Sequence, residues 1–445
     1  MSRSVGTLRW SRPSIGLLVI ALALCALTAA GPTLHLRLGD WALIAIFGVG
    51  SMGAFCATRL GELADQRSAL PLILIGAAAM RLALLFTEPT LSTDIYRYIW
   101  DGRVQAPGIN PYRYVRAAPE LGPLRDPAIW PLINRAEYAV TIYPPVAQAL
   151  FLGVTRIGEN VVVMKLVLLL FEAGGVGTII ALLQRLAMPP TRVAAYAWHP
   201  LPVWEIAGNG HIDAAMIALL MVGLLVFLHG RTLLAGMVAT LGALIKPTAL
   251  LALPVFWRPW DWKLPLAVVA TIGVAYVPYL SIGNGVLGYL GAYLKEEGFS
   301  EGPGFRVVWL VEQLTGSLPL AGAVYGALAA LVLAGVALAV GFRGDRSATS
   351  AIRSLNWLLI VFLALSTPHY PWYFLVLTPF LALSPTATAW TLTTVSVFLH
   401  YVYPGATVPG YGTRFAIVTL AMLAALAYDL FGGRRKASHP VGETS

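Results

Sequence analysis

The sequence is poor in charge and in cysteine. Asp, Glu, Lys and Arg make up 11% of its 445 residues, against about 25% in a soluble globular protein. With 58% hydrophobic residues, this composition excludes a soluble enzyme. Cys25 and Cys56 are the two cysteines and both lie in apolar stretches, so neither a disulfide framework nor a thiolate metal site is expected. The 30 basic residues exceed the 21 acidic ones, but they flank apolar runs and do not indicate nucleic-acid binding.

What the chain does contain is a series of apolar runs that predict membrane spans. We expect about fourteen, at residues 14–30, 41–58, 69–86, 145–157, 161–186, 212–227, 233–245, 248–256, 264–280, 318–342, 355–365, 374–383, 390–400 and 415–431. Lys246-Pro247 separates two of them, because proline interrupts a helix. The predicted fold class is an all-α polytopic membrane protein with both termini in the cytoplasm.

The distribution of basic residues predicts which loops lie outside. Arg59 and Arg67 mark a cytoplasmic turn, which places residues 88–143 in a first external loop and residues 283–317 in a second. Residues 187–211 are expected to form an external loop, although Arg185 and Arg192 then violate the rule. We treat residues 1–431 as one integral membrane domain and 432–445, with Arg434, Arg435 and Lys436, as a basic cytoplasmic tail.

Residues 92–103 predict a short amphipathic helix at the start of the first external loop. At 3.6 residues per turn, one face carries Asp94, Arg97, Tyr98 and Asp101. The opposite face, with Ile95, Ile99 and Trp100, suits the bilayer interface. An aspartate held there can take a proton from an acceptor hydroxyl. The same spacing also describes a surface helix with only local ion pairs, and the pattern alone does not separate the two readings.

Several motifs together resemble one enzyme family. They are DIYRYIWDGRV at 94–104, GINPY at 108–112, IYPP at 142–145, GNGHID at 208–213, LIKPT at 244–248 and PHYPWYF at 368–374. This combination resembles bacterial membrane glycosyltransferases of the GT-C superfamily, in particular the polyprenyl-phosphate-mannose-dependent mannosyltransferases of the glycosyltransferase 87 type. Ile212 replaces the polar residue that is usual in the fourth motif. The resemblance implies a GT-C-type bundle of 12–14 transmembrane helices, with amphipathic interfacial helices in the first external loop.

The resemblance also implies a catalytic base. An acidic residue of the first external loop has this role in the superfamily, which carries over to Asp94, with Asp101 as second choice. The donor phosphate needs cations near the outer headgroup level. The candidates are Arg97, Arg103, Arg113, Lys246 and Arg306. For Lys246 the alternative is a side chain that reaches along a kinked helix toward the outer surface.

The later motifs supply candidate substrate-binding residues. These are Tyr98, Asn209, His211, Asp213, His369 and Tyr370. Each has a structural alternative: His211 and Asp213 fit a capped helix start, and aromatic residues at a span mouth fit interfacial anchors. Metal ligation by His211 and Asp213 is disfavoured, because no third His, Asp or Glu lies nearby. Glu172 lies within a span beside small residues, which favours a structural hydrogen bond to a neighbouring helix.

The function that this resemblance implies is inverting transfer of a hexose, foremost mannose. The donor would be a polyprenyl-phosphate sugar and the acceptor a lipid or glycan, on the periplasmic face of a bacterial inner membrane. No cofactor is expected, a divalent metal is not indicated, and the partners are membrane lipids with no nucleic acid. One alternative is transfer of another lipid-linked sugar, such as glucose or aminoarabinose, to a glycolipid. The other is a lipid or oligosaccharide transporter, which would need ionisable residues near the membrane midplane.

Overall fold

The computed structural model describes residues 11–300, 302, 304–316, 320–400 and 410–432, and in these residues the regular structure is entirely helical. Eight helical stretches are long and apolar enough to cross a membrane. They are α1 (Arg12–Leu38), α2 (Asp40–Leu63), α3 (Gln66–Leu85), α6 (Val161–Arg185), the run Lys263–Glu296, α15 (Ala321–Gly341), α16 (Ala348–Ser366) and the run Gly412–Gly432. The prediction of an all-α polytopic membrane protein is confirmed.

Six shorter apolar helical stretches complete the series. They are α5 (Pro145–Thr155), α9 (Asp213–Leu228), α10 (Thr232–Ala243), η5 with α11 (Pro247–Ala252, Leu253–Phe256), η7 with α17 (Pro371–Leu377, Thr378–Leu383) and α18 with η8 (Ala387–Val395, Ser396–Leu399). The eight long and six short stretches correspond one for one to the expected spans. The run Lys263–Glu296 comprises α12 (Lys263–Tyr276), η6 (Val277–Leu287) and α13 (Leu290–Glu296), and the last run comprises most of α19 (Tyr411–Ala427) with η9 (Tyr428–Gly432).

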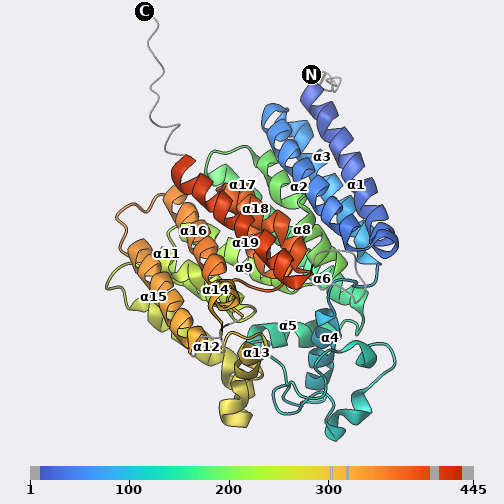
Figure 1. Ribbon diagram of the computed structural model, residues 1–445, viewed down its shortest axis with the longest axis vertical. Coiled ribbons are helices and arrows are strands. Elements are labelled where there is room, and N and C mark those ends of the chain that lie inside the picture. Colours follow the sequence, from blue (N-terminus) through green and yellow to red (C-terminus); the bar gives the residue numbers. More distant parts are fainter. Residues whose placement is uncertain (1–10, 301, 303, 317–319, 401–409, 433–445) are drawn as a thin grey trace, which may run out of the picture.

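The stretch expected as a span at 145–157 forms a helix shorter than a membrane crossing. Its eleven residues form α5, which at about 1.5 Å per residue extends only about 17 Å. That is roughly half of a ~30 Å hydrocarbon core. Instead of crossing, α5 lies against α4 (Asp94–Gln105), and the two helices form a lobe at one end of the molecule (Figure 1). The lobe also contains η1 (Pro119–Leu124) and η2 (Trp130–Leu132).

The missing crossing is made by a stretch that the sequence predicted as a loop. After α6, η3 (Pro190–Val193) lies beside the turn between α2 and α3, where Arg192 pairs with Glu62 at 3.4 Å and Thr191 donates to the Gly61 carbonyl at 2.8 Å. The chain then returns through α7 (Ala194–Ala197), α8 (Pro200–Pro202) and the π-helix η4 (Val203–Gly208). Arg185 and Arg192 therefore lie at the same end as Arg59 and obey the basic-residue rule.

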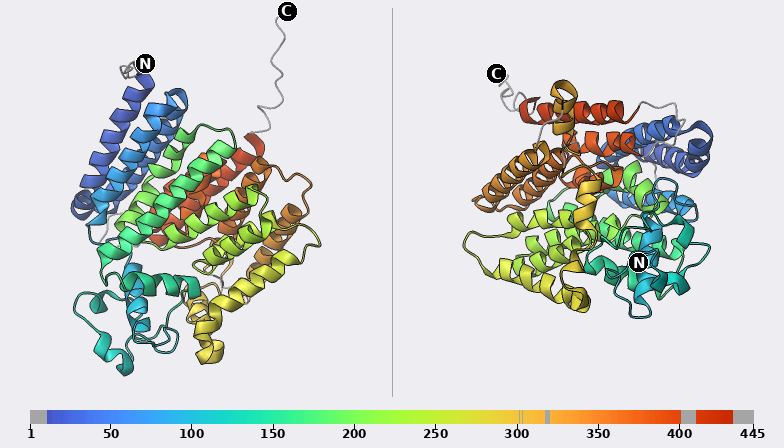
Figure 2. Two further views of the ribbon diagram at one scale, coloured as in Figure 1. Left: turned by 180° about the vertical axis from the view of Figure 1, so that it is seen from behind. Right: turned by 60° about the horizontal axis from the view of Figure 1, so that its bottom comes forward.

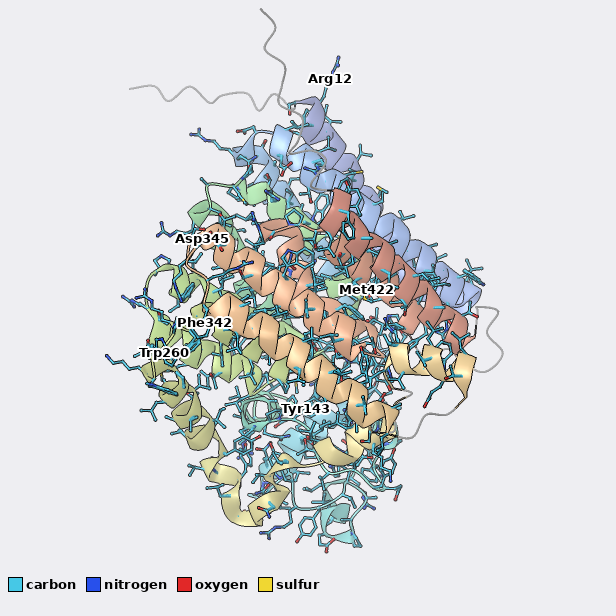
Figure 3. All side chains as sticks on the ribbon, turned by 60° about the vertical axis from the view of Figure 1, so that its left-hand side comes forward. Arg12, Tyr143, Trp260, Phe342, Asp345 and Met422 are labelled. Carbon is cyan, nitrogen blue, oxygen red and sulfur yellow. The ribbon has the colours of Figure 1, made fainter. Side chains whose placement is uncertain are left out.

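The two ends of the molecule carry different parts of the chain. Helix α1 begins, and α19 ends, at the end opposite to the lobe (Figure 1), and the views in Figure 2 agree. Arg12 and Asp345 lie toward that end in Figure 3, and Tyr143 lies toward the lobe. The expected basic tail, with Arg434, Arg435 and Lys436, lies outside the described residues, as do 401–409 of the last expected loop.

Helix α4 is not the interfacial helix that its pattern predicted. Ile95, Ile99 and Trp100, expected at the bilayer surface, are at most 1% exposed. Trp100 packs on Trp130 of the lobe, and Ile95 packs on Gly210, between η4 and α9. Gly102 allows the packing of α4 on α5, since a Cβ there would collide with the Phe151 carbonyl. The apolar face of α4 therefore anchors the helix inside the protein, and its first turn faces inward.

Buried polar contacts fix where α4 begins. The Lys165 ammonium of α6 donates to the carbonyls of Leu84 and Thr87 at 3.4 and 2.6 Å, which holds the end of α3 just before α4. Deeper in the bundle, Arg81 pairs with Glu172 at 2.7 Å. Glu172 thus has a structural partner on a neighbouring helix, and the pair is compensated as a buried charge must be.

The helix break at Lys246-Pro247 is confirmed. Helix α10 and the η5–α11 stretch form a hairpin with Lys246 at its tip, in extended conformation. The Leu244 carbonyl at the tip accepts hydrogen bonds from the amides of Val146 and Ala147 at the start of α5, both at 3.2 Å. These bonds satisfy helix-end donors and bring the hairpin tip against the lobe.

The corrected arrangement predicts a labelling pattern. In a background without Cys25 and Cys56, single cysteines replace the exposed residues Glu120, Gln184 and Gly344. An impermeant thiol reagent added from the lobe side should label the variant at Glu120 only, because the end of α6 lies at the other end with residue 344. Labelling of Gln184→Cys together with Glu120→Cys would restore the fourth expected span and contradict the structure.

Candidate active site

A cavity of about 1730 Å³ lies between the lobe, the hairpin tip and the loops beyond α12 and α16. Polar residues gather on one part of its wall and include Thr93, Asp94, Arg97, Asn134, Arg135, Tyr143, Lys246, Tyr293, Glu297, His369 and Tyr370. The remaining wall is largely apolar, with Leu250, Leu251, Ile272, Leu280, Leu290, Leu294 and Leu333. The cavity thus combines a charged end with an apolar extension.

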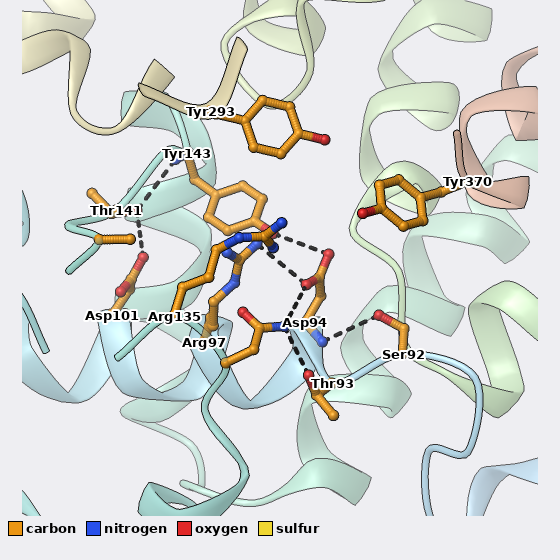
Figure 4. A network of polar contacts seen from close by, with 12 residues as sticks. Ser92, Thr93, Asp94, Arg97, Asp101, Arg135, Thr141, Tyr143, Tyr293 and Tyr370 are labelled. Atoms are coloured by element: carbon orange, nitrogen blue, oxygen red, sulfur yellow. Dashed lines mark hydrogen bonds and ion pairs between the residues drawn. The ribbon is translucent and has the colours of Figure 1, made fainter. Parts of the chain in front are cut away.

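Asp94 is at the charged end, on the first turn of α4. Its carboxylate is 3.2 Å from the Arg97 guanidinium and 3.5 Å from both the Tyr143 hydroxyl and the Asn134 amide (Figure 4). Its side chain is 16% exposed, and it lines the cavity. Asp94 is therefore reachable from the cavity while being surrounded by donors.

The cations around Asp94 lower the pKa of its carboxyl. Burial alone would raise the pKa of its carboxyl, because burial penalises the charged form. Arg97, His211 and Lys246 act in the opposite direction, and the net pKa of Asp94 is lower than its ordinary value of 3.8. At neutral pH the carboxylate can therefore accept a proton.

Arg97 lies one turn further along α4 and is 6% exposed. It donates to the Tyr143 hydroxyl at 2.8 Å and lies 5.3 Å from the centre of that ring. Among the described residues its Nε has no hydrogen-bond partner. A buried donor without a partner is costly, and Arg97 brings its positive charge to the cavity wall.

Lys246 enters the site from the hairpin tip. Its ammonium pairs with Asp213 at 2.6 Å and lies 5.1 Å from the Tyr373 ring centre. Asp213 is 2% exposed and supports the lysine from behind. The expected residues Asp213 and Lys246 therefore act as a unit, of which Lys246 lines the cavity.

A stack of rings forms another wall. His211, Trp372 and Tyr370 lie face to face, with centres 4.4 Å apart for His211–Trp372 and 4.6 Å apart for Trp372–Tyr370. Behind the stack His211 is 3.3 Å from Glu205, which also contacts His400 at 3.1 Å. Tyr370 and His211 were both candidate substrate-binding residues; Tyr370 lines the cavity, whereas His211 is buried and is not part of the cavity wall.

Asp101, the second candidate base, has a structural environment. It pairs with Arg116 at 3.2 Å, accepts from Thr141 at 2.5 Å and accepts from Gln148 at 3.1 Å. Both Asp101 and Arg116 are 2% exposed. Asp101 is not part of the cavity wall, so the geometry favours Asp94 over Asp101 as the base.

Five further predicted residues are also not part of the cavity wall, and one of them, Arg113, is an exposed residue of the first loop. Arg103 is held by Asp126 and Glu159 at 2.6 and 2.7 Å. The Arg306 guanidinium donates to the Pro368 carbonyl at 2.9 Å. Tyr98 stacks on Phe151, and Asn209 bridges the Leu91 amide and the Trp204 carbonyl.

Arg135 and Glu297 line the cavity although no sequence motif singled them out. Arg135 contacts Glu296 at 2.7 Å and Glu297 at 3.2 Å, so the first and second loops are joined by ion pairs. Glu297 also contacts His369 at 3.1 Å. In the sequence, the two adjacent glutamates at 296 and 297 of the second loop were the one feature that could have indicated these site residues. In the part of the chain that the structure describes, no three His, Cys, Asp or Glu residues cluster as metal ligands would.

Comparison with known proteins identifies relatives of the chain. Residues 14–260, more than half of the sequence, match the family described as "Alpha-(1->6)-mannopyranosyltransferase, N-terminal domain". Alpha-(1->6)-mannopyranosyltransferase A of Mycobacterium tuberculosis is 27% identical over 192 residues, 40% of this chain and 34% of that protein. The enzyme of the same name from Corynebacterium glutamicum is 28% identical over 191 residues, 40% of this chain and 37% of that protein. The matched region is thus about a third of each relative's length. No solved structure matches the chain.

The different surroundings of the two aspartates predict different effects on stability. Asp101→Ala leaves the Arg116 guanidinium buried without its carboxylate, which costs ~3–5 kcal/mol. The midpoint of thermal unfolding should fall clearly for this variant and change little for Asp94→Asn, because Asp94 borders a cavity. Equal midpoints for Asp101→Ala and the wild-type protein would show that the buried network is not structural.

Proposed function

The chain belongs to the alpha-(1->6)-mannopyranosyltransferase family, and on that premise we propose that it transfers mannose from a polyprenyl-phosphate donor to the 6-hydroxyl of a mannose-containing lipid or glycan. The reaction is a single displacement with inversion at the anomeric carbon, on the extracytoplasmic face. One observation carries the proposal: an aspartate, Asp94, lies 3.2 Å from Arg97 and shares with Lys246 the charged end of an otherwise apolar cavity.

Asp94 is the proposed catalytic base. As the acceptor oxygen attacks the anomeric carbon, its proton passes to the Asp94 carboxylate. The bond between the anomeric carbon and the phosphate oxygen breaks, and its electron pair stays on the phosphate. One negative charge therefore leaves Asp94 as one appears on the lipid phosphate.

Arg97 is the proposed cation that pairs first with Asp94 and then with the departing phosphate. It pairs with Asp94 at 3.2 Å, and its Nε has no partner among the described residues. When Asp94 is protonated, the guanidinium loses its counter-charge and is available to the departing phosphate. Stabilising charge where it develops is the largest contribution that such a site can make.

Lys246 is the second proposed phosphate ligand. It is at the boundary between the charged end and the apolar wall, to which Leu250 and Leu251, four and five residues later in the chain, belong. A polyprenyl phosphate has the same division into anionic head and apolar tail. With the phosphate bound beside Lys246, the polyprenyl tail would lie along the apolar wall and extend toward the lipid.

The distribution of basic residues supports the proposed orientation. Arg12 lies at the end opposite to the lobe in Figure 3, and Arg59 and Arg192 both contact Glu62 at the turn between α2 and α3; the positive-inside rule places the cytoplasm at this end. The cavity then opens toward the extracytoplasmic side. Its charged residues gather at the lobe, which favours an enzyme over the transporter alternative, because a transporter site is expected near the midplane.

The proposal is tested with purified protein, polyprenyl-phosphate mannose and a mannoside acceptor. Asp94→Asn should lower turnover by ~10²–10⁴, as expected for loss of a general base, and should leave donor binding largely intact. Glu88→Gln is the matched control, because Glu88 is an exposed carboxylate six residues earlier that contacts Tyr96 and is not part of the cavity wall. Turnover of Asp94→Asn within threefold of wild type would remove Asp94 as the base.

A further inference from the structure

We propose that Glu297 binds the acceptor sugar by accepting a hydrogen bond from one of its hydroxyl groups. The inference rests on the proposed function, which leaves the acceptor side of the cavity unassigned. Glu297 belongs to the second loop, directly after α13, and it lies on the cavity wall with its side chain 7% exposed.

The hydrogen bonds of Glu297 leave one acceptor position open. Its Oε1 accepts from the Tyr370 hydroxyl at 3.0 Å and from Arg135 at 3.2 Å. Its Oε2 is 3.1 Å from His369 Nδ1. Each carboxylate oxygen can accept about two hydrogen bonds, so Oε1 is filled and Oε2 retains one position. A ligand that takes this position must be a hydrogen-bond donor, and among sugar groups that donor is a hydroxyl.

The neighbourhood of Glu297 suits a pyranose ring. Tyr370, which donates to Glu297, is the outermost ring of the stack that continues through Trp372 to His211. Aromatic rings offer a flat apolar face, and a pyranose presents axial C–H groups to such a face. A sugar on Tyr370 would therefore meet the aromatic face and the Glu297 carboxylate together.

This position is compatible with attack near Asp94. In Figure 4 the Tyr370 ring and the Asp94 carboxylate face the same gap, with Tyr293 alongside. Tyr293 hydrogen-bonds to Tyr373 at 3.0 Å, which fixes this part of the wall. An acceptor held by Glu297 through one hydroxyl can thus present another hydroxyl to Asp94.

The neighbouring residue Glu296 provides a matched control. It binds the same Arg135 guanidinium, at the shorter distance of 2.7 Å, and it is not part of the cavity wall. If the carboxylates only hold Arg135 and join the two loops, Glu296→Gln and Glu297→Gln should have similar effects. If Glu297 binds the acceptor, only Glu297→Gln should affect it.

The experiment uses the full-length protein in lipid nanodiscs with octyl α-mannopyranoside as acceptor. Binding is followed by tryptophan fluorescence, since Trp372 lies in the stack, and transfer is followed with polyprenyl-phosphate mannose. Glu297→Gln should weaken binding and raise the KM for the mannoside by roughly 10–100-fold, as for loss of a hydrogen bond to a charged group. The donor KM should stay within threefold, and Glu296→Gln should change neither value more than twofold.

A series of 2-, 3- and 4-deoxy mannosides identifies the hydroxyl. One deoxy analogue should bind wild type more weakly than the parent mannoside, and this difference should vanish in Glu297→Gln. The inference is overturned if Glu296→Gln and Glu297→Gln weaken mannoside binding equally. It is also overturned if the loss of affinity from removing the hydroxyl and the loss from Glu297→Gln are additive. In either case, transfer by the wild-type protein still upholds the proposed function. Binding without transfer would reject the proposed function and keep the site, and absence of both would reject both.

Discussion

A carboxylate that stays ionised inside a membrane protein is the constraint on which the rest of the site depends. Asp94 is mostly buried, and burial favours the neutral acid. Arg97, Lys246 and His211 lower the pKa of its carboxyl, and they come from α4, the hairpin tip and the turn between η4 and α9. Three parts of the chain must therefore meet at one point before the aspartate can act as a base.

Much of the architecture serves this meeting. The short helix α5 packs on α4, and the amides of Val146 and Ala147 at its start bond to the hairpin tip that carries Lys246. The cations are held in place by polar partners. Lys246 pairs with Asp213, and Arg97 donates a hydrogen bond to the Tyr143 hydroxyl. Each charge is thus compensated in the resting state, and the proposed reaction moves one negative charge from Asp94 to the phosphate without leaving Arg97 uncompensated.

The sequence predicted the fold class and the parts of the site that lie in compact motifs. Asp94, Arg97, Lys246, His369 and Tyr370 all line the cavity, because each motif brings its polar residue to the end of a helix. Apolar composition could not distinguish α5, covered by protein, from a helix covered by lipid. Pro189, Pro190, Pro200 and Pro202 divided the true crossing into pieces too short to recognise. Arg103 looked available because its partners, Asp126 and Glu159, are distant in sequence. Arg135 and Glu297 belong to two irregular loops, and a contact between irregular loops cannot be predicted from the periodicity of the sequence.

The pH dependence of mannosyl transfer tests the central claim most directly. The base must be deprotonated, and the pKa of Asp94 is lower than 3.8, so kcat/KM of the wild-type protein should decline only below about pH 4. Arg97→Gln removes the main cation that lowers this pKa, and the decline should then move to higher pH. A wild-type decline centred near pH 6, unmoved by Arg97→Gln, would contradict the account that Asp94 is a base kept ionised by its cations.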